Sequence, residues 1–218
     1  RHARKDEDAI GAEHAHHAEV NAVPVNLTAA IPDGVSFDDA AYATVGSIAI
    51  QACRQANLRF GETAVVIGLG LIGQIAARVL AAADVRVFGV DTNRVRVDLA
   101  VASGAIADGG TPADAGLAER IVAAAGGFGV DAVLLAVDSD SNQPVELAVR
   151  LVRDRGVITD IGNTRIELPW KDCYAKELDF RFSRSYGPGR YDPVYEEQGV
   201  DYPVGYVRWT EQRNMAHF

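Results

Sequence analysis

Three glycines stand between an apolar run and a helix-forming run in V-V-I-G-L-G-L-I-G-Q (Val65–Gln74). Glycine permits tight turns and close ligand approach, and the free N–H groups that begin a helix attract an anion. In this G-x-G-x-x-G spacing we assign Gly68 to the turn, Gly70 to the approach of a pyrophosphate and Gly73 to close helix–strand packing. The motif predicts a dinucleotide site, and the alternative is a glycine-tolerant turn in a nucleotide-free α/β domain. The intervening site positions are Leu69, Leu71 and Ile72.

An acidic residue further along the chain also indicates dinucleotide binding. Asp91 lies at the end of the next apolar run, 18 residues after Gly73 (91 − 73). A carboxylate there accepts hydrogen bonds from the adenosine ribose hydroxyls and repels a 2′-phosphate, so NAD is favoured over NADP. Thr92 follows Asp91 in the site, and Arg94 is placed to reach a phosphate, which keeps NADP as the less favoured cofactor.

Two later strand ends should border the nicotinamide half of the cofactor. In parallel sheets, ligands lie beyond the carboxyl ends of the strands. Val137-Asp138 and Ile161-Gly162-Asn163 follow the expected fourth and fifth strands. Gly162 would allow close backbone approach, or it is simply a turn glycine. For Asp138 we favour the role of a helix N-cap.

The elements that must position these residues alternate along the chain. Short β-branched runs are separated by longer alanine-rich runs from Thr63 onward. This order predicts an α/β fold with a doubly wound parallel sheet of the Rossmann type. We expect strands at 63–67, 85–90, 105–107, 132–137 and 156–161, helices at 71–83, 94–103, 113–125 and 142–153, and a half-exposed edge strand at 178–182.

The two flanks of this repeat differ from it. Upstream, the apolar spacing predicts a helix over residues 38–57, preceded by a short strand at 19–25 and a turn at 32–34. After Ser185 the apolar residues follow neither helical nor strand spacing. A long aromatic stretch rich in glycine and proline follows. Such stretches are usually functional or form interfaces.

Composition bounds the class of protein. With 218 residues and 48% apolar content, the chain can bury a sizeable core. A net charge of −9 argues against a nucleic-acid partner. The apolar runs are far shorter than the roughly 20 residues of a membrane helix, and we expect no membrane partner. Two cysteines are too few for a disulfide framework, so we expect a cytoplasmic location.

Several motifs together resemble the medium-chain dehydrogenase/reductase superfamily, the zinc-alcohol-dehydrogenase-like proteins. They are P-D-G-V-S-F-D-D-A-A (Pro32–Ala41), Q-A-C-R-Q-A (Gln51–Ala56) and G-E-T-A-V-V-I-G-L-G-L-I-G (Gly61–Gly73). The tail S-R-S-Y-G-P-G-R-Y-D-P (Ser183–Pro193) is similar to bacterial bi-domain oxidoreductases, in which a Gfo/Idh/MocA-like domain follows the dehydrogenase. The resemblance covers about residues 19–185.

The resemblance implies a GroES-like catalytic domain, of which only a remnant is present here. In the zinc enzymes of this superfamily a further Cys or Glu ligand sits where this chain has Ala43-Thr44, so a catalytic zinc is not supported and no metal site is expected. We divide the chain into the catalytic-domain remnant (1–37), the dinucleotide-binding domain (38–185), and an aromatic tail (186–218) that returns to the catalytic part or forms an interface.

Weaker catalytic candidates come from the same resemblance. Thr44 and Ser47 lie where this superfamily places small hydroxyl residues near the nicotinamide, and helix capping is their alternative role. The aromatic and basic tail residues would line a sugar-sized pocket or an interface. They are Tyr186, Tyr191, Tyr195, Tyr202, Tyr206, Arg184, Arg190, Arg208 and Trp209.

The histidine and cysteine residues are weak candidates for metal binding and for nucleophilic chemistry. His14, His16 and His17 could ligate a metal, but we favour an added terminal segment or a strand surface. Cys53 lies on an apolar helical stripe, and we expect core packing rather than nucleophilic chemistry. Cys173 is expected in a more open loop, with no histidine near it in sequence.

Together these patterns predict an NAD-dependent oxidoreductase. It would move a hydride between nicotinamide and a hydroxyl or carbonyl group of a small, sugar-like substrate, without zinc as far as this chain shows, and we expect a homodimer. The alternatives are a truncated NAD(H)-binding module without catalysis of its own, and a nucleotide fold that serves as an assembly scaffold.

Overall fold

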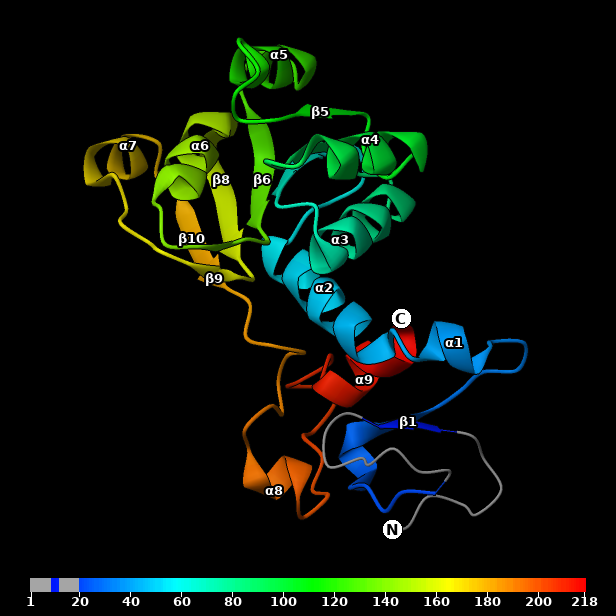
Figure 1. Cartoon of the computed structure of the whole chain (residues 1–218). Helices are drawn as coiled ribbons and strands as arrows, with labels where there is room; N and C mark the ends of the chain where they lie inside the picture. The colour runs from blue at the N-terminus through cyan, green and yellow to red at the C-terminus, as the bar shows by residue number, and fades with distance from the viewer. Residues whose placement is uncertain (1–8, 12–19) are drawn as a thin grey trace. The chain divides into compact units, whose positions relative to one another are not determined.

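The computed structural model describes residues 9–11 and 20–218 (Figure 1). The chain forms two compact units, which are described separately. Unit 1 comprises Arg1–Gln51 and Arg184–Phe218, and unit 2 comprises Ala52–Ser183. The aromatic tail therefore belongs to the same unit as the N-terminal residues. The domain boundaries after residues 37 and 185 stay a prediction.

Unit 2 is built on a six-stranded parallel sheet in the order β10-β8-β6-β3-β4-β5. The chain starts in the middle, at β3, moves outward through β4 and β5, and then crosses to β6, β8 and β10. This is the expected doubly wound sheet. The order in which the chain adds strands runs one way from β3 to β5 and the opposite way from β6 to β10, so the strand order reverses between β3 and β6. The strands are β3 (Thr63–Ile67), β4 (Arg86–Val90), β5 (Asp108–Gly110), β6 (Val130–Leu135), β8 (Val152–Asp160) and β10 (Asp179–Phe182).

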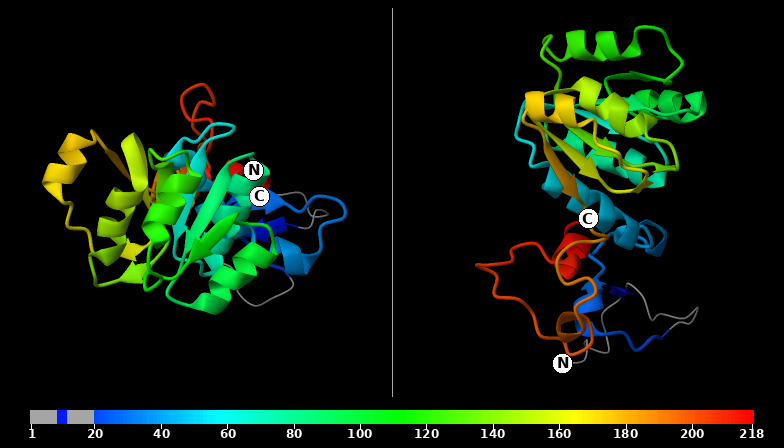
Figure 2. Two further views of the ribbon diagram at one scale, coloured as in Figure 1. Left: turned by 90° about the horizontal axis from the view of Figure 1, so that it is seen from above. Right: turned by 90° about the vertical axis from the view of Figure 1, so that its left-hand side faces the viewer.

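Helices cover both faces of this sheet (Figure 2). Side chains alternate between the two faces of a strand. Val65 and Ile67 of β3 pack in one buried cluster with apolar residues of α5 and α6. Val66 points to the other face, where α3 lies close to it. The helices are α3 (Leu71–Ala82), α4 (Arg94–Ala102), α5 (Leu117–Ala124), α6 (Gln143–Leu151) and α7 (Trp170–Ala175).

Several boundaries in unit 2 differ from the sequence expectation, and two of them have a clear local cause. The strand expected at 105–107 begins at Asp108, because the N–H groups of Ala105 and Ile106 both bond to the Ala100 carbonyl and finish α4. The helix expected from residue 113 begins only at Leu117. The residues before it form a turn in which Asp114 accepts the Thr111 N–H at 3.0 Å. Local hydrogen bonds therefore replace strand or helix at both places.

Unit 1 contains short elements joined by long loops. A strand pair, β1 (Ala9–Gly11) and β2 (Thr28–Ala30), is antiparallel. The helix expected over 38–57 is broken into α1 (Phe37–Ala40) and α2 (Ala43–Ala56), and the last turns of α2 belong to unit 2. Residues 20–25 form no strand, which corrects the described part of the strand expected at 19–25. The turn at 32–34 is confirmed, with Gly34 at φ 85°.

The tail contains two helices that its irregular sequence did not predict. These are α8 (Pro193–Glu196) and α9 (Glu211–His217). Thr210 caps α9 by accepting the Arg213 N–H. Helix α9 packs on the start of unit 1, because Met215 joins a buried cluster with Ala29 and Ala43. A short helix with one apolar side chain in the core carries too little periodicity to be recognised from sequence.

Candidate cofactor site

A pocket of about 770 Å³ lies at the carboxyl ends of β3, β4 and β6. This is where the strand order reverses, and the general rule for open α/β sheets places ligands there. Residues of α5 and α6 also line the pocket. Of the residues singled out from the sequence, the pocket brings together Gly68, Gly70, Asp91, Thr92, Val137 and Asp138.

The three motif glycines have different surroundings. Gly68 has φ +94°, and a Cβ there would lie 2.4 Å from the Ala136 carbonyl oxygen, so no other residue fits the turn. A Cβ on Gly73 would lie 1.8 Å from the Gly68 carbonyl oxygen, which shows how closely α3 packs on the turn. A Cβ on Gly70 would meet nothing within 4 Å, although Gly70 lines the pocket. The surface at Gly70 is therefore free for a ligand.

Leu69, Leu71 and Ile72 separate these glycines and do not line the pocket with their side chains. Leu69 is buried in the core, whereas Leu71 at the start of α3 is 54% exposed. The helix begins at Leu71 with Gly70 as N-cap and no side-chain cap. Its first N–H groups are thus available to an anion, which is the feature that a pyrophosphate requires.

Asp91 is buried beside this turn, and both of its carboxylate oxygens are engaged. Oδ2 accepts the Leu69 N–H at 2.7 Å, and Oδ1 accepts the Asn93 N–H at 2.7 Å. Arg96 Nη1 lies 3.6 Å from Oδ2. Each carboxylate oxygen can accept a second hydrogen bond. Asp91 therefore anchors the glycine turn and keeps the capacity to accept from a ribose hydroxyl.

Gln74 holds the same turn from the other side. Its Nε2 donates to the Leu69 carbonyl at 3.3 Å and to the Arg96 carbonyl at 2.9 Å. The Leu69 peptide group is thus bonded at its N–H by Asp91 and at its oxygen by Gln74. The turn is fixed by the protein's own contacts, so a ligand need not order it.

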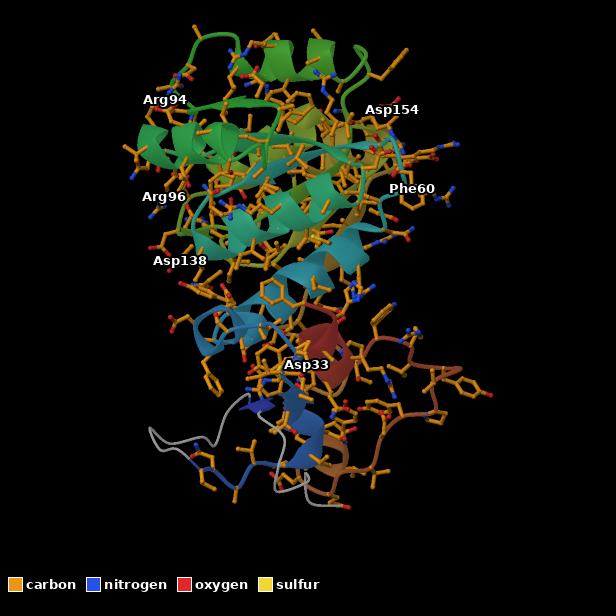
Figure 3. All side chains as sticks on the ribbon, turned by 90° about the vertical axis from the view of Figure 1, so that its right-hand side faces the viewer. Asp33, Phe60, Arg94, Arg96, Asp138 and Asp154 are labelled. Carbon is orange, nitrogen blue, oxygen red and sulfur yellow. The ribbon has the colours of Figure 1, made fainter. Side chains whose placement is uncertain are left out.

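Two arginines follow Asp91, and they are placed differently along one side of the unit (Figure 3). Arg94 donates from Nη1 to Asp114 Oδ2 at 2.8 Å, and its Nε lies 3.3 Å from Asp98 Oδ1. Backbone and hydroxyl hydrogen bonds from Thr111 lower the pKa of Asp114 and keep this partner ionised. Arg96, rather than Arg94, lines the pocket.

The ends of the later strands form a small parallel pair, β7 (Asp138–Ser139) and β9 (Asn163–Thr164). Asp138 Oδ1 accepts from Asn163 Nδ2 at 3.0 Å. Asp138 is not the N-cap of α6, because that position belongs to Asn142. A Cβ on Gly162 would lie 1.9 Å from the Val137 carbonyl oxygen, so the close approach at Gly162 is to the neighbouring chain segment.

Next to this pair, Asp160 is buried at the end of β8. Burial raises the pKa of its carboxyl group, although Asp160 Oδ1 accepts the Thr164 hydroxyl at 2.9 Å. Ile161 continues the ladder by donating its N–H to the Leu135 carbonyl at 2.9 Å. Ile161, Gly162 and Asn163 border the strand end without lining the pocket.

The hydroxyl candidates Thr44 and Ser47 belong to unit 1. The Ser47 hydroxyl is buried and donates to the Thr44 carbonyl at 2.7 Å. This bond satisfies the helix backbone, as Ser and Thr often do within one turn. A role for either residue near the nicotinamide stays a prediction.

The two cysteines have raised pKa values. Burial raises the pKa of Cys53 to about 12, and its partly buried thiol donates to the Ala76 carbonyl at 3.7 Å. Burial also raises the pKa of Cys173 on α7. Neither thiol has the lowered pKa of a reactive nucleophile. His14, His16 and His17 lie outside the described residues.

The tail residues do not share one pocket. Tyr186 and Tyr195 are buried in unit 1, whereas Tyr206 is 91% exposed. Tyr195 stacks on Tyr202 with ring centroids 5.2 Å apart, and a hydrogen bond to Asp192 raises the pKa of Tyr202 to about 12. Tyr186 and Tyr195 therefore belong to the core of unit 1 rather than to a binding surface.

Residues 9–11 and 20–218 bring together no group of three His, Cys, Asp or Glu side chains suited to a metal ion. These residues do not fit a catalytic zinc, which needs at least three protein ligands. Over the same described part of the chain, no helix has the length and apolar character to cross a membrane.

A doubly wound sheet with a G-x-G-x-x-G turn at its switch point defines a dinucleotide-binding α/β domain. The chain belongs to the zinc-binding dehydrogenase family, whose model matches residues 72–198. The resemblance to the medium-chain dehydrogenase/reductase superfamily is thereby confirmed. The additional likeness to bi-domain oxidoreductases with a Gfo/Idh/MocA-like domain stays a prediction.

Relatives and solved structures agree with this assignment. D-xylulose reductase of Saccharomyces cerevisiae is 32% identical over 174 residues, which are 76% of this chain and 48% of that protein. D-xylulose reductase A of Aspergillus oryzae is 29% identical over 181 residues, 80% of this chain and 50% of that protein. The alcohol dehydrogenase TADH from Thermus sp. ATN1 has a TM-score of 0.67 at 25% identity, covering 73% of this chain and 46% of that one. The chain spans about half the length of these relatives.

Sequence reasoning missed several pocket residues. Arg96 follows Arg94 by two positions, and only the direction of its side chain distinguishes the two. Asp114 lies in a turn after β5 and carries no motif. The residues that α6 contributes are Gln143, Pro144, Glu146, Leu147 and Arg150. Helix periodicity marks such residues only as the edge of an apolar face, so no sequence signal was present for them.

Proposed function

We propose that this chain is the NAD-binding part of an oxidoreductase that acts on a hydroxyl or carbonyl group of a small, sugar-like molecule. One observation carries the proposal: the pocket at the sheet's switch point has Gly70 open to it, the start of α3 uncapped and Asp91 beside the turn. Family membership supports a dehydrogenase activity. The D-xylulose reductases among the relatives support a polyol or sugar substrate.

Each residue of the site has a separate task in this proposal. The first N–H groups of α3 and the bare surface at Gly70 hold the pyrophosphate. Asp91 accepts from a ribose hydroxyl, which favours NAD over NADP. Val137, Asp138 and the segment from Ile161 to Asn163 border the nicotinamide half. Arg94 and Thr92 flank the adenosine end.

The nicotinamide supplies the redox chemistry when it is bound, by accepting or giving a hydride. The chain's own groups bind the cofactor and fix its position. During oxidation the substrate hydroxyl also loses a proton, and Thr44 and Ser47 are the candidates to relay it. No step through zinc is assigned to this chain, because its described residues offer no donor set for the ion.

We further propose a cytoplasmic protein that acts as a homodimer. Leu168, Trp170 and Tyr174 leave an exposed apolar surface on unit 2, and this supports self-association. The second candidate function is a binding module that holds NAD(H) without catalysis. It is favoured by the Ser47 hydroxyl, a candidate for proton relay, which instead donates to the Thr44 carbonyl at 2.7 Å.

Measurements of cofactor binding and of turnover on the 218-residue chain test these proposals. NADH fluorescence and calorimetry with NAD should show one binding site, and an assay at 340 nm against polyols, sugars and alcohols should show turnover. Binding without turnover would favour the silent module. If neither NAD nor NADP binds at millimolar concentration, both proposals are wrong.

A further inference from the structure

Asp160 places a carboxyl group in an otherwise apolar row of unit 2. The row crosses the sheet through Ile67 of β3, Leu135 of β6, Asp160 of β8 and Phe182 of β10, which are partners in the strand register. Ile158 lies two residues before Asp160, on the same face, and belongs to the buried cluster that includes residues of α5 and α6. Asp160 is only 7% exposed. Aspartate is rarely buried unless it is paired, so this carboxyl group is a candidate for a functional role.

Within residues 9–11 and 20–218, no ion pair neutralises Asp160. Burial raises the pKa of its carboxyl group, and no charged side chain contributes to the shift. Hydrogen bonds from the Thr164 hydroxyl, at 2.9 Å, and from the Gly162 N–H favour the ionised form. The group is therefore neutral below its raised pKa, and above it the group is a buried negative charge held by hydrogen bonds alone.

The charged residues on the elements around Asp160 have partners of their own. These elements are β6 and β10 on either side of β8, the pair β7 and β9 beyond its end, and α6 on the same face of the sheet. The partnered residues are Asp131 with Arg153, Asp138 with Asn163, Arg165 with Glu167, Arg181 with Asp179, Glu146 with Asn142, and Arg150 with Glu119. In the described part of the chain, the charge of Asp160 is therefore not cancelled by a cation beside it.

Asp160 directly precedes the segment that borders the nicotinamide half of the proposed cofactor site. Residues 161–163 follow it in the chain, and its hydrogen-bond partner Thr164 belongs to β9. Strand β9 pairs with β7, whose Asp138 lines the pocket. A charge on Asp160 therefore acts on the nicotinamide end of a bound cofactor, whereas Asp91 serves the adenosine end.

We infer that Asp160 sets the preference of this site between the oxidised and the reduced cofactor, because its ionised carboxylate favours the oxidised form. The nicotinamide ring is positively charged in NAD and neutral in NADH, and charged protein groups tune such cofactors. A buried carboxylate attracts the charged ring, and screening is weaker there than at the surface. Asp160 does not line the pocket and acts through space. The inference rests on the proposed function, since it requires a nicotinamide at this strand end.

The ratio of two affinities tests this role. Calorimetry with NAD and fluorescence titration with NADH, on the 218-residue chain between pH 4.5 and pH 8.5, give both dissociation constants. In the wild type, the affinity for NAD relative to NADH should increase about fivefold or more as the pH rises through the pKa of Asp160, and then become constant. Asp160→Asn keeps the shape of the side chain without its charge, so it should show the low-pH ratio at every pH.

Two further variants separate charge from structure. Asp154→Asn removes an exposed acidic residue near the other end of β8, far from Asp138 in Figure 3, and should leave the ratio unchanged. Thr164→Val removes a hydroxyl that favours the ionised form of Asp160, so the preference for NAD should appear only at a higher pH. A purely structural role for Asp160 would weaken the binding of both cofactors equally and leave their ratio unchanged.

The outcomes distinguish this inference from the proposed function. If NAD and NADH both bind, but their ratio is independent of pH in the wild type or changes equally in Asp160→Asn, the inference is wrong and the cofactor site stands. If neither cofactor binds, both are wrong. If Asp160→Asn does not fold, the pH dependence of the wild type and its displacement in Thr164→Val decide the question.

Discussion

The carboxylate of Asp91 accepts the backbone N–H of Leu69 at 2.7 Å, across 22 residues of sequence. The contact joins the end of β4 to the glycine turn after β3. A residue that the motif marks as a ribose ligand is thus also a structural anchor for the pyrophosphate turn. Replacing Asp91 should therefore affect two separate quantities, the stability of the fold and the affinity for the cofactor.

Asp91→Asn should weaken both tasks. An amide can still accept one N–H, but its NH₂ group faces a second backbone donor, from Leu69 or Asn93. We expect the free energy of unfolding to fall by about 1–3 kcal/mol. The affinity for NADH should fall about tenfold or more, because the turn loses its anchor and the ribose loses an acceptor. Urea unfolding and NADH titration measure the two effects, and unchanged stability would show that the Leu69 contact is dispensable.

Gly70 and Gly73 provide a matched pair. Gly73→Ala brings a Cβ to within 1.8 Å of the Gly68 carbonyl oxygen unless the backbone moves, so it should cost about 1–3 kcal/mol of stability. Gly70→Ala meets no protein atom within 4 Å and should leave the melting temperature nearly unchanged. It should nevertheless weaken NADH binding, because the methyl group occupies the surface that the pyrophosphate approaches. Tight NADH binding by Gly70→Ala would contradict the assigned site.

Arg96 and Arg94 should differ in their effect on cofactor choice. Arg96 lines the pocket near Asp91, whereas Arg94 is engaged by Asp98 and Asp114. Arg96→Gln should lower NADPH affinity about tenfold and NADH affinity much less, because a guanidinium at that position faces a 2′-phosphate. Arg94→Gln is the control and should leave the ratio of the two affinities unchanged. If only the Arg94 variant changes the ratio of the two affinities, Arg94 rather than Arg96 contacts the 2′-phosphate, and the prediction is wrong.

Asp131 should make the free energy of unfolding of unit 2 depend on pH. Burial alone would raise its pKa, but hydrogen bonds from Arg153 and from the Thr63 N–H and hydroxyl outweigh this and lower it. The folded-state pKa therefore lies below the unfolded value. The stabilisation is complete above the unfolded pKa, near pH 4, and is lost as the pH falls through the folded pKa.

Asp131→Asn should therefore be less stable than the wild type at pH 7, by about 1 kcal/mol after allowance for solvent screening. The difference should shrink in acid, as the wild-type carboxylate becomes protonated. Urea unfolding between pH 3 and pH 7 measures this trend. A difference that is constant over the range would show that lost packing, rather than charge, is the cause.

The elements of unit 2 followed from local sequence. The run from Thr63 to Ile67 forms the expected strand because five consecutive apolar or β-branched residues suit a strand that is buried on both faces. Gly68 and Gly73 were identified correctly because their requirements, a positive φ and close packing, arise within six residues of chain. The cofactor class also came from short spacings, since Asp91 lies one β-α-β step beyond the glycines.

Contacts between distant segments were decided only by the tertiary structure. The register of β4 on β3 brings Asp91 to the Leu69 N–H, and the pitch of α4 turns Arg96 rather than Arg94 toward the pocket. The burial of Tyr195 and the placement of the tail with the N-terminal residues depend on packing that no local period encodes. Sequence determines which groups are present and their local conformation, and folding determines which of them face each other, because hydrogen bonds and burial act through space.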